Sequence, residues 1–304
     1  MEDLAQLTTE QDNPASQDLD KRSSAEIVSV INLEDARVAH AVRTELPKIA
    51  EAVDTIVERM RRGGRLVYIG AGTSGRIAAM DAMECVPSFG VPEERIRILL
   101  AGGEQAMFHS VEGAEDDTDA AARSIDQIDV GPEDAVIGVA ASGRTPYVLA
   151  AMREARARGA ATIGIVNNRA TPMHEVADVT IAVLTGPEVV TGATRMKAGT
   201  AQKMVLNTLT TATFIRLGKV YSNQMVDVKA VNSKLRNRAR RILISVAKVD
   251  PVTADTALAE ADYDVKVAVV MLLADVSAEE ARDRLKAASG YVRRASENKQ
   301  GQAS

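Results

Sequence analysis

The spacing of hydrophobic residues changes along this chain, and each change predicts a different kind of element. Short continuous apolar runs, typical of buried strands, occur at 65–70, 96–101, 135–140, 161–166 and 179–184. Stretches with helical spacing separate them, near 74–83, 105–127, 146–158 and 171–176. Strands that alternate with helices indicate a parallel sheet covered on both faces. We therefore expect a three-layer, doubly wound α/β fold with five parallel strands.

Helical spacing also dominates both ends of the chain. Helices are expected over 25–32, 34–62, 197–217, 227–247, and in a small three-helix unit over 254–296 with helices at 254–261, 263–273 and 278–296. The pattern predicts three regions: an N-terminal arm with helices (1–50), an α/β ligand-binding domain (51–220) and a helical C-terminal region (221–304). Residues 1–24 are polar and irregular, and either form a loosely held terminus or reach over a site.

Two loops between a strand and a helix have the chemistry of an anion site. They are Gly70-Ala71-Gly72-Thr73-Ser74-Gly75 and Ala141-Ser142-Gly143-Arg144-Thr145-Pro146. Glycines let the backbone approach a ligand, free N–H groups at a helix start point at an anion, and hydroxyls add donors. Because ligands of such sheets bind at the carboxyl ends of the strands, the pair of loops predicts one shared phosphosugar site.

The first loop also matches G-x-G-x-x-G, the dinucleotide fingerprint. That fingerprint expects an acid at the end of the second strand, about 20 residues further on. Here the first acid after that strand is Glu104, near 30 residues on. The second loop also has no place in a simple dinucleotide site, so we favour a phosphosugar over NAD.

Composition and charge narrow the class of protein. The chain has 304 residues, of which 46% are hydrophobic and 26% charged, and a net charge of −5. It has no block of Lys and Arg, no apolar signal core and no run that reaches the roughly 18 apolar residues of a membrane span. We expect no nucleic-acid or membrane partner, and a cytoplasmic location because Cys85 is the only cysteine.

A basic stretch near the C-terminus is the one feature that suggests a charged surface. It contains arginines at positions 236, 238, 240 and 241. No aromatic residues interleave them, as they do on many surfaces that bind nucleic acid. We interpret these arginines as a solvated or intersubunit face.

Carboxylates are the remaining candidates for proton transfer, since no metal-ligand spacing involves the three histidines and no pattern pairs a serine with a histidine. Glu84 is flanked by Met83, Cys85 and Val86, so it is either partly buried with a raised pKa or an exposed acid near a helix end. Glu112 and Glu115 lie in an acidic run after the second strand, where acids commonly precede a helix. Residue chemistry alone does not choose among these acids.

With these motifs the chain resembles the N-acetylmuramic acid 6-phosphate etherases, bacterial members of the sugar isomerase (SIS) domain family. The matching stretches are GAGTSGR (70–76), DAMEC (81–85), LLAGGE (99–104), VEGAEDD (111–117), AASGRTPYV (140–148), EVVTGATRMKAGTAQK (188–203) and NQMVDVKAVNSKL (223–235). Residues 262–296 are similar to the small C-terminal helical unit of the family. The chain departs from the family's frequent DASECPPT, because it reads DAMECVPS at 81–88.

The resemblance implies a lyase that needs no cofactor. It would cleave the D-lactyl ether of N-acetylmuramic acid 6-phosphate by elimination and then hydration, giving N-acetylglucosamine 6-phosphate and D-lactate. The two acid/base glutamates of the family map onto Glu84, as proton donor, and Glu115. The expected substrate-binding residues are Gly72, Thr73, Ser74, Ser142, Gly143, Arg144, Thr145 and Lys197, although a structural role for Lys197 is equally consistent with the sequence.

Two questions remain open at the level of sequence. Glu84 is ten residues past Ser74, about 15 Å along a helix, which is long for one monosaccharide. Either the helix ends early or Glu84 serves the site of a neighbouring subunit, since SIS proteins commonly form dimers. A phosphosugar aldose–ketose isomerase and a non-catalytic phosphosugar sensor, like the related glucokinase regulatory protein, are the alternative functions.

Overall fold

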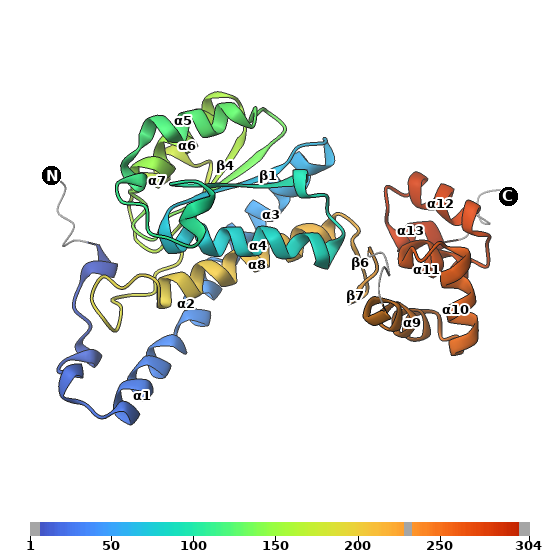
Figure 1. The fold of residues 1–304 in the computed structure, drawn as a ribbon, viewed down its shortest axis with the longest axis horizontal. Helices are drawn as coiled ribbons and strands as arrows, with labels where there is room; N and C mark the ends of the chain where they lie inside the picture. Colours follow the sequence, from blue (N-terminus) through green and yellow to red (C-terminus); the bar gives the residue numbers. More distant parts are fainter. Residues whose placement is uncertain (1–6, 228–232, 298–304) are drawn as a thin grey trace. The chain divides into compact units, whose positions relative to one another are not determined.

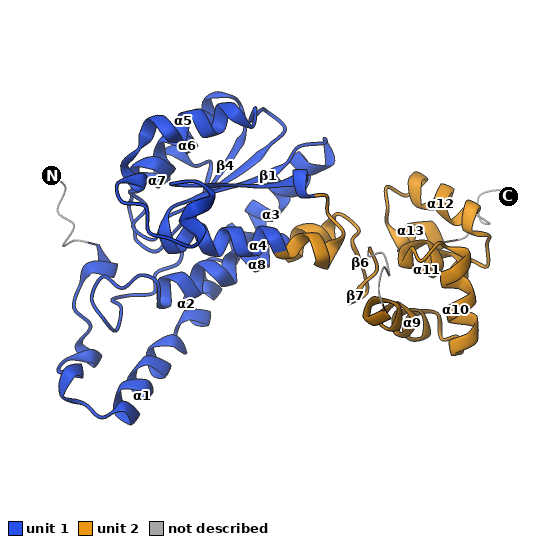
Figure 2. Cartoon of the chain, viewed as in Figure 1, with its two compact units in different colours: residues 1–83, 93–210 blue, residues 84–92, 211–304 orange. Residues whose placement is uncertain are grey.

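The computed structural model describes residues 7–227 and 233–297. The chain divides into two compact units, one made of residues 1–83 and 93–210 and the other of residues 84–92 and 211–304 (Figure 2). No helix in the described ranges combines the length and the apolar composition needed to cross a membrane.

A parallel sheet forms the centre of the first unit (Figure 1). In spatial order its strands are β2 (Ile96–Leu100), β1 (Leu66–Gly70), β3 (Ala135–Val139), β4 (Ala161–Val166) and β5 (Val179–Ala182). Every residue of β1, β3 and β4 is buried, as expected for strands covered on both faces. The strand order reverses between β1 and β3, which makes their carboxyl ends the switch point of the sheet. The predicted doubly wound fold with five parallel strands is confirmed.

Helices cover both faces of this sheet. Those that begin in the first unit are α1 (Ser24–Asp35), α2 (Val38–Thr44), α3 (Leu46–Arg61), α4 (Gly72–Phe89), α5 (Thr118–Gln127), α6 (Pro146–Ala157), α7 (Met173–Val176) and α8 (Lys197–Arg216). Helix α6 contacts β1, β3 and β4, and α5 packs on α6. Helix α3 contacts β3, β4 and β5 from the opposite face (Figure 1). Its buried residues, which include Ile49, Val53, Ile56 and Met60, follow helical spacing.

A buried polar cluster joins α4 to the sheet and to α8. The carboxylate of Asp81 accepts a hydrogen bond from the Tyr68 hydroxyl (2.7 Å), the Asn207 amide (2.5 Å) and the Thr210 hydroxyl (3.1 Å). A buried carboxylate with three donors is well solvated by the protein itself. Asp81 therefore fixes the direction of α4 within the first unit.

The segment between β2 and α5 differs from the expectation. A helix was predicted over 105–127, but only Thr118–Gln127 is α-helical. The preceding residues form the short 3-10 turns Glu104–Met107 and Ala114–Asp116. Gly113 has a φ of +71°, which an α-helix does not accommodate, and Asp117 starts α5 by accepting a hydrogen bond from the Ala120 N–H (2.8 Å).

The second unit is mainly helical. It contains the hairpin β6 (Val220–Tyr221) and β7 (Gln224–Met225), then α9 (Ser233–Ala247), α10 (Pro251–Glu260), α11 (Val265–Ala274), α12 (Ala278–Ala287) and α13 (Val292–Ser296). Residues 228–232 of the helix predicted over 227–247 lie outside the described residues. The predicted single helix over 278–296 is divided because Ser289 and Gly290 both have positive φ. Helix α11 is mostly buried and packs with α9, α12 and α13 around one apolar core.

Candidate active site

Both candidate loops lie at the switch point of the sheet. The first follows β1 and the second follows β3, and these strands are paired in parallel with Gly70 opposite Val139. Helix α4 begins at Gly72 and α6 begins at Pro146, so two helix N-termini open at the same edge of the sheet. Backbone N–H groups and the positive ends of two helix dipoles are therefore directed to one region, as anion binding requires.

Glycines in the first loop allow a very close approach of α4 to β1. A Cβ atom on Gly75 would lie 2.3 Å from Leu100 Cδ1 and 2.8 Å from the carbonyl carbon of Gly70. A Cβ atom on Gly70 would lie 2.6 Å from the Cα atom of Gly75. Strand and helix consequently meet through their backbones, which accounts for the glycine spacing that resembles the dinucleotide fingerprint.

The second loop is held by a different set of contacts. Gly143 has a φ of +64°, and a Cβ atom there would lie 2.3 Å from Thr171 Oγ1. The Ser142 hydroxyl accepts a hydrogen bond from the Arg144 N–H at 3.2 Å. Thr145 occupies the N-cap of α6 without a side-chain capping hydrogen bond. Its hydroxyl is therefore not consumed by the helix that it begins.

The arginine that follows the first loop has a structural role. Arg76 donates from Nε to the Ala106 carbonyl (2.8 Å) and from Nη2 to the His109 carbonyl (3.1 Å). These contacts attach the segment between β2 and α5, which carries Glu112 and Glu115, to the start of α4. Of the arginines near the two loops, Arg144 is thus the one we retain as a candidate for substrate binding.

A cavity of about 390 Å³ opens at the carboxyl end of β2. Its lining includes Glu112, Asp117 and Tyr147 but not Glu115. Burial raises the pKa of Tyr147, whose hydroxyl donates a hydrogen bond to Ser124 Oγ (3.2 Å). The cavity therefore brings Glu112, the acid that the family pattern does not select, next to a neutral phenol.

Both candidate glutamates are exposed in the structure. Of the two alternatives for Glu84, the structure matches the exposed acid, because its apolar neighbours in sequence lie on different sides of α4: Cys85 is 2% exposed and Met83 is 56% exposed. Helix α4 continues to Phe89, so the alternative in which it ends before Glu84 is wrong. Glu115 lies in the 3-10 turn Ala114–Asp116. Catalytic roles for Glu84 and Glu115 stay predictions.

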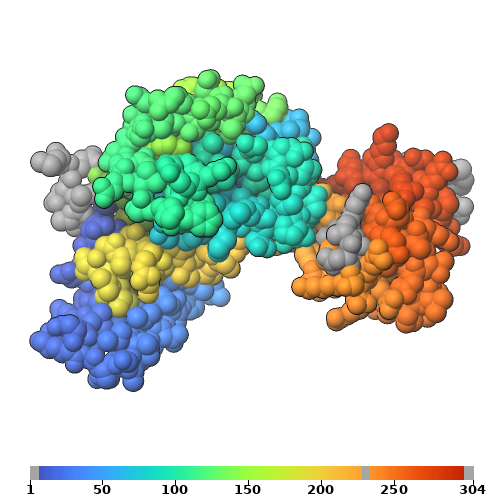
Figure 3. Space-filling view, in the orientation of Figure 1, coloured from blue at the N-terminus to red at the C-terminus, as the bar shows by residue number. Residues whose placement is uncertain are grey.

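The N-terminal arm is anchored next to the second loop. Asn168, just after β4, donates hydrogen bonds to the Thr9 hydroxyl and to the Ala141 carbonyl, both at 3.0 Å. Its carbonyl oxygen accepts one from the Thr8 hydroxyl (2.8 Å), and the Gly192 N–H donates to the Thr9 carbonyl (3.3 Å). In Figure 3 the arm (blue) lies against the segment that follows β5 (yellow). The described part of the arm is therefore held at the carboxyl edge of the sheet.

Lys197 is buried within this unit. Its side chain is 2% exposed in the folded chain, and its ammonium forms an ion pair with Glu34. Although burial alone raises the pKa of Glu34, hydrogen bonds from Lys197, Asn13 and Arg37 lower that pKa to about 2. This arrangement matches the structural alternative for Lys197, and its contact with substrate stays a prediction.

A second buried carboxylate completes the surroundings of Lys197. Glu188 accepts hydrogen bonds from the backbone N–H groups of Lys197 (3.0 Å) and Ala198 (2.9 Å) at the start of α8. Burial raises the pKa of Glu188. Two carboxylates with pKa values shifted in opposite directions therefore flank one lysine, which sequence patterns did not reveal.

Comparisons with known proteins identify the family. The glucokinase regulatory protein N-terminal SIS domain matches residues 48–156, and the SIS domain matches residues 109–212. The chain is 52% identical over 293 residues to N-acetylmuramic acid 6-phosphate etherase of Mycolicibacterium smegmatis, covering 96% of this chain and 98% of that protein. It is 50% identical over 294 residues to the etherase of Rubrobacter xylanophilus, covering 97% of each. The chain belongs to the N-acetylmuramic acid 6-phosphate etherase family.

The fold of this chain is similar to the folds of solved phosphosugar isomerases. A phosphoheptose isomerase from Francisella tularensis matches with a TM-score of 0.51 and 16% identity, over 63% of this chain and 98% of that one. A putative phosphosugar isomerase involved in capsule formation from Bacteroides fragilis matches with a TM-score of 0.50 and 23% identity, over 65% and 94%. At these identities the similarity concerns the fold alone.

Proposed function

We propose that this etherase family member cleaves the D-lactyl ether of N-acetylmuramic acid 6-phosphate and releases N-acetylglucosamine 6-phosphate and D-lactate. The observation that carries the proposal is identity of about half the residues, over nearly the whole chain, to relatives that bear the etherase name. The same observation disfavours an aldose–ketose isomerase and a non-catalytic sensor. The enzyme is thus a carbon–oxygen lyase of amino sugar catabolism.

The two loops supply the binding chemistry in this proposal. Gly72, Thr73 and Ser74 begin α4, and Ser142 to Thr145 precede α6, at neighbouring strand ends. The phosphate and sugar oxygens of the substrate accept hydrogen bonds from the hydroxyls and helix-start N–H groups, and Arg144 adds positive charge. This arrangement predicts strong dependence on the 6-phosphate.

Elimination and hydration follow from the position of the ether. In the ring-opened sugar, C2–H is α to the aldehyde and the lactyl oxygen is on C3. One carboxylate takes the C2 proton, the C3–O bond breaks with its electron pair leaving on oxygen, and a carboxylic acid protonates that oxygen to give lactate. Water then adds to C3 of the unsaturated aldehyde while C2 regains a proton. We assign proton donation to Glu84 and the second acid/base role to Glu115.

The continuity of α4 bears on how Glu84 reaches substrate. Along an unbroken helix Ser74 and Glu84 are about 15 Å apart, and α4 runs from Gly72 to Phe89. We therefore propose a homodimer in which Glu84 acts at the site formed by the loops of the partner subunit. A cytoplasmic location is also proposed, supported by a sequence with a single cysteine, which is buried.

The decisive experiment is incubation with N-acetylmuramic acid 6-phosphate, with an assay for D-lactate. In D₂O the sugar product is expected to carry deuterium at C2, and in ¹⁸O-water the label is expected at C3 and not in lactate. A ketose product without lactate would favour the isomerase. Lactate release with neither C2 exchange nor a primary isotope effect on C2-deuterated substrate would refute elimination.

A further inference from the structure

One exposed face of helix α4 is apolar beside the glutamate that we assign to proton donation. Met80 and Met83 are each 56% exposed, and Glu84 and Pro87 are exposed as well. Residues three and four positions apart lie on the same side of an α-helix, so positions 80, 83, 84 and 87 of α4 share one face. Glu84 is the charged group among these four side chains. We call Met80 and Met83 the methionine pair.

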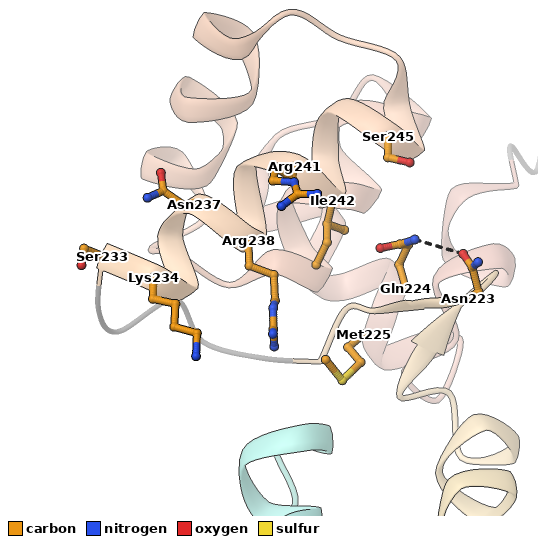
Figure 4. Close-up of a pocket in the computed structure, with 10 residues that line it drawn as sticks. All are labelled: Asn223, Gln224, Met225, Ser233, Lys234, Asn237, Arg238, Arg241, Ile242 and Ser245. Atoms are coloured by element: carbon orange, nitrogen blue, oxygen red, sulfur yellow. Dashed lines mark hydrogen bonds between the residues drawn. The ribbon is translucent and has the colours of Figure 1, made fainter.

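Packing within the chain does not account for the methionine pair. The inward side of α4 is formed by other residues, such as Ala82 and Cys85, which are buried. A large apolar side chain that stays in water gains little of the free energy that its burial would give. Polar side chains are the common alternative on exposed faces: in Figure 4, Lys234 and Arg238 extend from one side of α9. Two adjacent exposed methionines therefore point to a ligand with an apolar part.

The carboxylate on the same face is also not used within the chain. Glu84 forms no hydrogen bond or ion pair with any other described residue. It is therefore free to approach the ether oxygen of a bound substrate to the distance of about 2.6–3.2 Å that proton transfer requires. Helix α4 is continuous from Gly72 to Phe89, so the methionine pair keeps a fixed position beside Glu84. A substrate that meets Glu84 consequently meets two thioether side chains as well.

The lactyl ether presents an apolar group close to the atom that Glu84 protonates. Its ether oxygen is bonded to a carbon that carries a methyl group, a hydrogen and a carboxylate, so the methyl carbon is two bonds from that oxygen. Side chains four positions apart on a helix have Cβ atoms about 5–6 Å apart, and methionine is long, unbranched and flexible. Met80 and Met83 can therefore reach the methyl group while Glu84 forms a hydrogen bond with the ether oxygen.

We propose that the methionine pair contacts the methyl group of the D-lactyl ether and thereby selects lactyl ethers over ethers that lack this methyl group. The inference rests on the proposed function, in which Glu84 protonates the ether oxygen. In a hydrophobic pocket, one methylene group changes kcat/KM by about 10–200-fold. The methionine pair lies on an open face and not in a closed pocket, so the lower end of that range, about tenfold, applies. Met80 and Met83 are thus specificity residues and take no part in proton transfer.

Two substrates that differ by one methyl group test the proposal: the 3-O-D-lactyl and the 3-O-carboxymethyl ethers of N-acetylglucosamine 6-phosphate. Formation of N-acetylglucosamine 6-phosphate gives kcat/KM for each, and the ratio of the two values is the readout. We expect the wild type to prefer the lactyl ether by about tenfold or more. Met80→Ser/Met83→Ser should bring the ratio close to one, whereas M80L/M83L, which preserves an apolar surface of similar volume, should retain the preference. Val252→Ser, at a 74% exposed position on α10, is the control with an unchanged ratio.

The outcomes separate this inference from the proposed function. Thermal melting should show that the variants stay folded, because the substituted side chains are exposed, and M83S alone should lower the ratio in part. A ratio near one in the wild type, an unchanged ratio in M80S/M83S, or an equal loss in M80L/M83L would overturn the inference and leave the etherase activity standing. If M80S/M83S lowers the sedimentation coefficient and slows both substrates equally, the face is an intersubunit contact and the inference is wrong. A wild type that releases no lactate would refute the proposed function, and the inference with it.

Discussion

The side-chain amide of Asn168 donates a hydrogen bond to the hydroxyl of Thr9, which precedes it by 159 residues. The same amide donates to the carbonyl of Ala141, the first residue of the second loop. One side chain thus connects the N-terminal arm to a loop that we assign to substrate binding. Such a contact orders the loop before the ligand arrives, which lowers the entropic cost of binding.

Asn168→Ala should therefore impair both stability and substrate binding. It leaves buried groups unpaired, which costs about 1–3 kcal/mol in the free energy of unfolding. We expect a higher KM for the phosphosugar with a smaller change in kcat, measured alongside urea unfolding. Asn32→Ala, at an exposed amide on α1, is the matched control. An unchanged KM in folded N168A would show that the arm does not order the loop.

Glu84→Gln and Glu115→Gln preserve shape and remove proton transfer. Each should lower kcat by about 10²–10⁴-fold, the usual contribution of general acid–base catalysis. Circular dichroism should show that both variants stay folded, because both glutamates are exposed. Glu112→Gln is the control within the same acidic run. A large loss for E112Q together with a normal E115Q would move the catalytic role to the acid that lines the cavity near β2.

Subunit complementation tests whether Glu84 acts across a dimer. A heterodimer of E84Q with Ser142→Ala/Thr145→Ala contains one intact site if Glu84 serves the loops of the partner subunit. Two affinity tags allow its purification after co-expression, and we expect about half of the wild-type kcat per dimer. If Glu84 serves the loops of its own chain, each site retains one defect, and the heterodimer should be as inactive as the parent variants.

The phosphate should account for much of substrate binding. Ser142→Ala/Thr145→Ala removes two hydroxyl donors, and hydrogen bonds to charged groups contribute roughly 1.5–3 kcal/mol each. We expect a large rise in KM for N-acetylmuramic acid 6-phosphate, whereas Thr208→Ala, exposed on α8, should have none. N-acetylmuramic acid without phosphate should be a very poor substrate. Equal turnover of the two sugars would exclude a phosphate site at these loops.

The ion pair of Glu34 and Lys197 predicts a pH-dependent stability. The pKa of Glu34 falls from an ordinary 4.5 to about 2 in the folded chain. Its contribution to stability is therefore complete above pH 4.5 and is lost as pH falls toward 2. Glu34→Gln leaves Lys197 buried without its partner and should cost about 3–5 kcal/mol at pH 7.

Urea unfolding at several pH values measures this effect. The difference in unfolding free energy between wild type and E34Q should shrink as pH falls from 4.5 toward 2. Glu51→Gln breaks the exposed ion pair with Lys48 and should cost at most about 1 kcal/mol, with little dependence on pH. A constant difference between wild type and E34Q would contradict the assigned pKa.

The strands and both loops were predictable because buried parallel strands are continuous apolar runs and glycines mark the turns between strand and helix. The absence of an α-helix before Thr118 was not predictable from the apolar spacing, because that spacing does not show that Gly113 has a positive φ, which an α-helix does not accommodate. The ion-pair partner of Lys197 was also not predictable from the sequence. Glu34 precedes Lys197 by 163 residues, and a sequence displays charges without displaying which of them meet.

The backbone contact between Gly70 and Gly75 has a consequence for how substrate preference can change. A contact without side chains has no rotamer that could absorb a substitution, so even a methyl group at either position must displace α4. The backbone of the first loop is thus held in one position against the sheet. A change in sugar preference must therefore come from side chains that can be substituted without moving α4. These are Thr73 and Ser74 in the first loop, and the residues of the second loop and of the N-terminal arm that contacts it.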